Sequence, residues 1–139
     1  MEVEEVPVET NNSFAVPELL SYVNYNQYTC GTKWSSNGET CAVSSETSVN
    51  IYSYYQNSLS YRASIKHAEC LYDWQMIGAD HILTTGRYQP VHLYKISDNK
   101  IDLQSTYKCI NHLDELSHAY SVALVKDGSS SYFYLGLKG

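Results

Sequence analysis

The sequence predicts an all-β fold built from repeated antiparallel units. Tyrosine is unusually common, with 14 of 139 residues, and only 17 % of the residues are charged. Tyr, Thr and Val favour the pleated, half-buried surface of a β-sheet. A strand–turn–strand pattern also recurs, and Trp34 and Trp74 mark a spacing of 40 residues within it. A period of roughly 40–45 residues is typical of the blades of a β-propeller.

The first unit shows how each repeat is built. Asn37-Gly38 predicts a hairpin turn, because both residues tolerate positive φ. Residues 41–45 and 49–52 follow it and alternate apolar with small or polar side chains, as half-buried strands do. We therefore expect antiparallel strands on both sides of a tight turn.

The second and third units repeat this pattern along the chain. Residues 82–86 and 91–94 match the two strands of the first unit, and a third unit begins at 121–128 with the turn Asp127-Gly128. Ile51-Tyr52 and Leu93-Tyr94 stand where WD-repeat blades usually carry Trp-Asp. The Asp is absent from both, so the repeats are degenerate.

These units predict a partial WD-repeat β-propeller of about three blades, with unit boundaries near 27–60, 61–105 and 106–139. Closed propellers have 4–8 blades, and we expect the intact ring to hold seven. Three blades leave two sheet edges open, so we expect a fragment of a ring. One hypothesis left open is that the fragment alone forms nothing stable, because stacked blades bury a continuous core only with their neighbours.

The first residues differ in composition from the repeats. Residues 1–13 carry four glutamates and no Lys or Arg, which predicts a flexible acidic tail before the partial propeller of residues 14–139. No basic segment followed by an apolar run indicates a secretory signal, and no run approaches the ~20 apolar residues of a membrane helix. We therefore expect an intracellular protein that is neither secreted nor bound to a membrane.

Other classes of site find little support in the sequence. The net charge is −6, so a basic face that neutralises phosphates along the whole chain is excluded. The cysteines have no short paired spacing, and His67 and Cys70 lack a second ligand pair, so we expect no metal and no cofactor. His118 precedes Ser121 by three residues, but no nucleophile elbow surrounds that Ser. We expect no enzymatic activity.

One segment is more specific than the repeats. Residues 107–121 contain the run Asn111-His112-Leu113-Asp114-Glu115-Leu116 between the second and third units. This run resembles the telomerase Cajal body protein family, in which a strand, an Asp-Gly turn and another strand follow it, as here. Residues 33–38 and 90–94 resemble further segments of that family in the same order, so the resemblance spans about residues 28–136. Asn37 and the run 118–120 depart from the family's pattern.

The resemblance implies an RNA-binding scaffold. Proteins of this family recognise a short loop element in small Cajal-body RNAs and associate with the box H/ACA ribonucleoprotein proteins. They direct those particles to Cajal bodies, so the implied location is the nucleus. Telomerase RNA stays open as a further client. The competing hypothesis is a generic WD-repeat scaffold that binds only proteins, which the acidic balance and the degenerate repeats favour.

The candidate binding residues follow from this segment and from one nearby cation. We expect His112 to stack on or bond to an RNA base, with Asn111, Asp114 and Glu115 beside it in the same inter-blade loop. The structural alternative is that His112 fixes the loop by a hydrogen bond within its blade. Arg87 is the fifth candidate, with Tyr88 and Lys108 as accessory surface residues.

Trp34 and Trp74 recur at the spacing of the repeat. Large aromatic side chains dominate burial in sheets, so both are expected in the core.

Overall fold

A computed structural model describes residues 19, 29–67, 70–110, 113 and 116–137. Within these residues the protein contains ten strands and no helix, which confirms the predicted all-β class. No helix in the described part is long and apolar enough to span a membrane. The predicted acidic tail, residues 1–13, lies outside the described residues.

The strands form three antiparallel sheets, in which neighbours along the chain are neighbours in the sheet. The first sheet comprises β1 (Thr29–Trp34), β2 (Thr40–Ser45), β3 (Ser48–Tyr55) and β4 (Ser58–Lys66). The second comprises β5 (Leu71–Ile77), β6 (His81–Gly86), β7 (Val91–Ser97) and β8 (Lys100–Tyr107). The third comprises β9 (Ala119–Asp127) and β10 (Ser130–Leu137). The boundary expected near residue 60 falls inside β4, which was not predicted as a strand.

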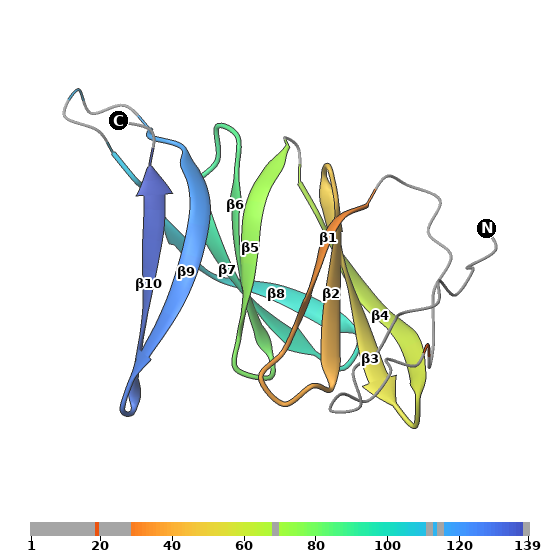
Figure 1. The fold of residues 1–139 in the computed structure, drawn as a ribbon. Coiled ribbons are helices and arrows are strands. Elements are labelled where there is room, and N and C mark those ends of the chain that lie inside the picture. The colour runs from red at the N-terminus through yellow and green to blue at the C-terminus, as the bar shows by residue number, and fades with distance from the viewer. Residues whose placement is uncertain (1–18, 20–28, 68–69, 111–112, 114–115, 138–139) are drawn as a thin grey trace, which may run out of the picture.

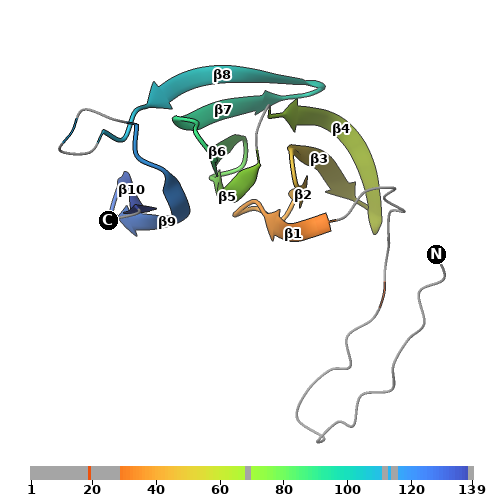
Figure 2. The same ribbon diagram turned by 90° about the horizontal axis from the view of Figure 1, so that it is seen from above.

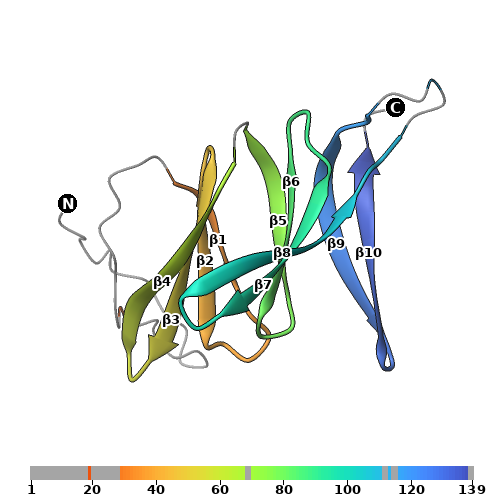
Figure 3. The same cartoon turned by 180° about the vertical axis from the view of Figure 1, so that it is seen from behind.

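The three sheets stand side by side in an arc that does not close among the described residues (Figure 1). Strands β1, β5 and β9 lie on the inner side of the arc, and β4 and β8 lie on the outer side (Figures 2 and 3). Because every sheet is an antiparallel meander, the connections alternate between two ends. We call the end with the β1–β2, β3–β4, β5–β6, β7–β8 and β9–β10 turns the hairpin end, and the other the loop end.

Turn chemistry determines the hairpin end. Gly38 has φ +74° and Gly128 has φ +58°, in the left-handed region that favours glycine. Both predicted turns, Asn37-Gly38 and Asp127-Gly128, therefore join adjacent strands as expected.

Apolar side chains fill the two spaces between the sheets. Between the first and second sheets lies a cluster of Ala42, Val49, Ile51, Ile65, Trp74, Met76, Ile82 and Ile96. Leu83 and Val91 pack against Ala119 and Val122 between the second and third sheets. Each four-stranded sheet thus contributes one face to the core shared by the first two sheets, and burial of this surface is the main favourable term in folding.

The two tryptophans do not share one environment. Trp74 is 6 % exposed, as expected for the core, but Trp34 is 46 % exposed, so its predicted burial is wrong. The pairing of the strands gives the reason. The register shifts of the first sheet recur in the second sheet 42 residues later, so Met76 occupies the position in the second sheet that Trp34 occupies in the first. Met76 packs against the first sheet. Trp34 lies on the face of the first sheet that is turned away from the second, where its ring meets Tyr54 edge-on at 5.5 Å.

Asp73 connects all three sheets by polar contacts. Its carboxylate accepts a hydrogen bond from Lys33 of β1 at 2.9 Å and from the backbone N–H of Val122 in β9 at 2.9 Å. It also accepts from the N–H of Trp74 at 2.9 Å. The Lys33 ammonium lies 5.1 Å from the centre of the Trp74 ring, so the same cation contacts both residues. The contacts of Asp73 thereby fix the inner strands β1, β5 and β9 relative to one another.

Candidate functional site

Four of the predicted binding residues, Asn111, His112, Asp114 and Glu115, lie outside the described residues. Their loop joins the end of β8, an outer strand, to the start of β9, an inner strand. Ile110 and Leu116 form a β-bridge, and the N–H of Ser117 donates to the carbonyl of Cys109 at 2.6 Å. The two arms of the loop therefore run side by side at the loop end of the molecule.

Beside these arms lies a group of aromatic side chains with one cation. We call Tyr72, Tyr88, His118, Tyr120 and Arg87 the aromatic cluster. The rings of Tyr72 and Tyr120 stack with centroids 4.6 Å apart and an interplanar angle of 22°. His118 meets Tyr88 at 4.7 Å and 67°, and Tyr120 at 6.2 Å. These contacts bring together residues from β5, β9 and the β6–β7 loop.

Two β-bulges create the stacked pair. The pairing of β5 with β6 skips Tyr72, since Leu71 pairs with Gly86 and the next pair is Asp73 with Thr85. The pairing of β9 with β10 skips Tyr120 in the same way. A bulge leaves one residue unpaired and re-aims its side chain. The same irregularity on two adjacent inner strands turns two tyrosines toward each other.

Tyr88 is held in an uncommon backbone conformation. Its φ is +54°, which costs a residue with a bulky side chain about 1 kcal/mol or more. His118 Nδ1 accepts the N–H of Tyr88 at 3.1 Å, and the guanidinium carbon of Arg87 lies 5.0 Å from the Tyr88 ring centre. His118 thus positions Tyr88 through its Nδ1 acceptor. Strain of this kind persists where the surrounding structure fixes it, often at binding sites.

The cluster exposes aromatic surface next to a positive charge. Tyr88 is 63 % exposed, Tyr120 is 44 % exposed, and Arg87 is exposed at the surface. Burial against its neighbours is the main cause that raises the pKa of the Tyr72 phenol, and the electrostatic effect of Tyr120 is the next. The phenol therefore stays protonated at neutral pH. The rings can stack on planar ligands, and Arg87 can contact an anion or a base.

Two residues expected from the sequence lie in this cluster. Arg87 was expected as a contact residue and Tyr88 as an accessory one, and the structure places both in the cluster. Lys108 is exposed after the end of β8, and no contact joins it to the cluster among the described residues. Tyr72 and Tyr120 were missed, because only strand register reveals that both are bulge residues.

The described residues contain no group of three or more His, Cys, Asp or Glu side chains that could hold a metal ion. Neither a protein-family model nor a curated protein matches this chain.

Proposed function

We propose that the chain forms successive blades of a WD-repeat β-propeller that binds RNA at its loop end. The three sheets would be three blades, the last one represented by its two inner strands. The repeated register shifts, 42 residues apart in the first two sheets, support this assignment, since WD-repeat blades recur at roughly 40–45 residues. Three blades of a seven-bladed ring agree with the open arc of sheets.

The aromatic cluster is the observation that best supports the proposal of RNA binding. Sequence-specific RNA recognition mostly targets single-stranded loops, whose unstacked bases lie on aromatic rings or on arginine. Tyr88 and Tyr120 offer exposed rings, and Arg87 lies against one of them. The chain has a net charge of −6, so stacking rather than a broad basic surface would supply the affinity.

The family resemblance narrows the RNA class. The run 111–116 that carries it ends two residues before His118 of the aromatic cluster in the sequence. We propose that the ligands are small Cajal-body RNAs, with telomerase RNA as a further client, and that the protein carries them with the box H/ACA proteins to nuclear Cajal bodies. The role is binding and not catalysis. The alternative, a scaffold for proteins alone, is favoured by the acidic charge.

Ultraviolet cross-linking and sequencing of RNA bound to the protein in its own cells tests this proposal. Enrichment of small Cajal-body RNAs that share one short loop element is the expected result. If only background RNA is recovered while partner proteins still co-precipitate after nuclease treatment, the protein scaffold replaces the RNA-binding function.

Variants of the cluster test the site itself. Tyr88→Gly removes the ring and also relieves the positive φ, so the melting temperature should be unchanged or higher. Loss of one stacked base should weaken binding to the cross-linked RNA on the order of tenfold or more. Tyr132→Ala removes an exposed ring from β10 and is the matched control. If the two variants weaken RNA binding equally, the cluster is not part of the RNA site.

A further inference from the structure

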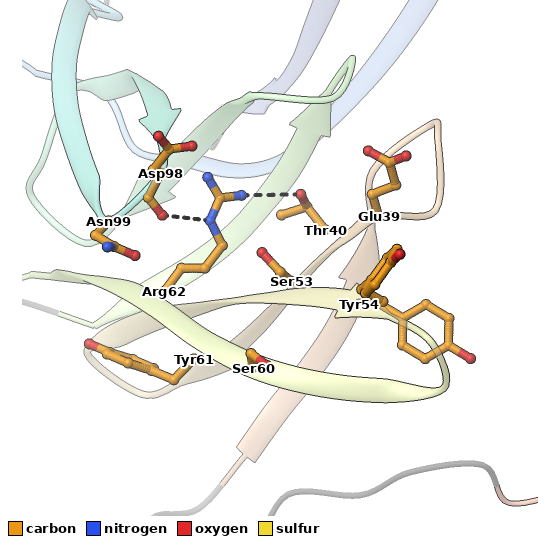
Figure 4. A pocket seen from close by; sticks show the side chains of 10 residues that line it. Glu39, Thr40, Ser53, Tyr54, Ser60, Tyr61, Arg62, Asp98 and Asn99 are labelled. Carbon is orange, nitrogen blue, oxygen red and sulfur yellow. Dashed lines mark hydrogen bonds between the residues drawn. The ribbon is translucent and has the colours of Figure 1, made fainter.

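A cavity of about 520 Å³ opens at the hairpin end, opposite to the aromatic cluster. It lies between the β3–β4 hairpin of the first sheet and the β7–β8 turn of the second (Figure 4). The lining residues that matter here are Glu39, Tyr54, Tyr55, Tyr61, Arg62 and Asp98, and we call this cavity the hairpin groove. Its volume lies within the range of 300–1,000 Å³ typical of ligand pockets.

Arg62 builds the floor of the groove. The pairing of β3 with β4 skips it, so this bulge residue points toward the second sheet. Its Nε donates to the carbonyl of Asp98 and its Nη2 to the carbonyl of Ser97, each at 2.8 Å. Its Nη1 donates to Thr40 Oγ1 at 3.5 Å. Arg62 therefore fixes the β7–β8 turn against the first sheet, and much of its donor capacity is used within the protein.

The two carboxylates of the groove have no cationic partner in the part of the chain that the structure describes. Glu39 accepts a hydrogen bond from the Asn37 amide at 3.0 Å. Among the described residues, neither Glu39 nor Asp98 forms an ion pair, whereas Lys100 is already paired with Asp102 at 2.8 Å. Arg62 is the one cation among the lining residues, and its N–H groups point at backbone carbonyls and Thr40, so the lining carries two negative charges and one positive charge. This favours a positively charged occupant.

The walls of the groove are aromatic and exposed. Tyr55 is 73 % exposed and Tyr61 is 60 % exposed, while Tyr54 is half-buried. Tyrosine is enriched at binding surfaces, because its ring gives a large contact area at a low cost in conformational entropy. Its face also attracts Arg and Lys side chains. Carboxylates beside tyrosine rings together suit the guanidinium or ammonium group of a peptide.

We propose that the hairpin groove binds a basic peptide segment of a partner protein. Arginine or lysine side chains would lie on the rings of Tyr55 and Tyr61, with their charges facing Glu39 and Asp98. A nucleic-acid strand would instead bring its phosphates next to these two carboxylates. The groove and the aromatic cluster lie at opposite ends of the sheets, so the peptide site does not depend on the proposed RNA site.

Fluorescence anisotropy of the full chain with a labelled peptide of alternating Arg and Ala tests this proposal. The peptide should bind, added salt should weaken it, and a peptide of alternating Glu and Ala should not bind. Glu39→Gln with Asp98→Asn should weaken binding on the order of tenfold. Tyr55→Ala should also weaken it, since the exposed ring is removed with little effect on the fold.

Two controls keep the result specific. Asp127→Asn neutralises an exposed carboxylate in the β9–β10 turn, and Tyr132→Ala removes an exposed ring from β10; both should leave binding unchanged. Melting curves and near-ultraviolet circular dichroism establish that each variant is folded. The proposal is overturned if no Arg peptide binds, if Asp127→Asn weakens binding as much as the groove variant does, or if single-stranded RNA occupies the groove in a Tyr55-dependent way. Tyr88→Gly should leave peptide binding intact.

Discussion

Asp73 makes contacts of very different energetic weight. Its ion pair with Lys33 is partly exposed, with side-chain exposures of 33 % and 21 %, and such pairs contribute about 1 kcal/mol or less. Its hydrogen bond to Val122 satisfies the N–H of a buried residue. A buried donor left without a partner costs about 1–3 kcal/mol. The backbone contact, and not the ion pair, should therefore dominate the contribution of Asp73 to stability.

Two substitutions separate these contacts. We expect Asp73→Ala to lower the free energy of unfolding by about 2–3 kcal/mol, because the N–H groups of Val122 and Trp74 both lose their acceptor. Lys33→Met keeps the apolar stem over Trp74 and should cost about 1 kcal/mol or less. Urea unfolding at constant m-value measures both. Equal losses for the two variants would mean that the ion pair is the main contribution.

At the scale of the elements, a polar row crosses the second sheet. Trp74, Thr84 and His92 are direct cross-strand partners on β5, β6 and β7. His67 stacks on His92 with ring centroids 6.4 Å apart, and its Nδ1 lies 3.1 Å from Gln89 Oε1. His67 Nε2 and His92 Nδ1 are buried and have no hydrogen-bond partner among the described residues. This row makes the packing between the first two sheets sensitive to protonation.

The pH dependence of stability follows from the two histidines. Burial lowers the pKa of both His67 and His92 below the ordinary value of 6.5, and the mutual repulsion of the two rings adds to the effect at His67. The unfolded chain then binds more protons than the native protein as pH falls below about 6.5. The contribution to stability is therefore complete above that pH and declines below it. We expect a lower melting temperature at pH 5.5 than at pH 7.5.

A double variant isolates this contribution. His67→Gln with His92→Gln should lose much of the difference in melting temperature between the two pH values, since neither position can then take up a proton. His81→Gln changes a histidine at the hairpin end and should keep that difference. A pH dependence that is the same in all three proteins would assign it to other groups.

The elements differ in how far the sequence determines them. The turns at Asn37-Gly38 and Asp127-Gly128 depend on backbone preferences of two adjacent residues, so local sequence is sufficient. β4 and β8 were not predicted, although apolar residues alternate with polar ones along both strands, as Leu59, Ala63 and Ile65 do in β4 and Ile101 and Leu103 do in β8. Their pairing with β3 and β7 skips Arg62 and Gln104, so alternation alone does not show which of their side chains are buried.

The bulges explain what was missed at the site and in the core. A bulge changes which face the following side chains take, and no residue type marks it in the sequence. The exposure of Trp34 and the stacking of Tyr72 on Tyr120 both depend on this register. Arg87 could be expected at the surface from its residue type, without knowledge of the strand register.

At the scale of the whole molecule, the three sheets are unequally supported. The first two share a core in which Ala42, Val49, Ile51 and Ile82 are 0 % exposed. The third sheet has two strands, and Val125, Tyr132, Tyr134 and Leu137 are exposed on it. Isolated two-stranded sheets are marginally stable in water. The contacts of Ala119 and Val122 with the second sheet therefore supply most of its support.

Native-state hydrogen exchange should resolve this difference. We expect the amides of β9 and β10 to exchange by local opening at a lower free energy than those of β2, β3 and β6, because few buried apolar contacts hold the third sheet. Asp73→Ala should lower protection in β9 more than in β2, since Val122 loses its acceptor. Equal exchange free energies in all three sheets would contradict this expectation. They would mean that the packing of Ala119 and Val122 on β6 and β7 makes the molecule unfold as one cooperative unit.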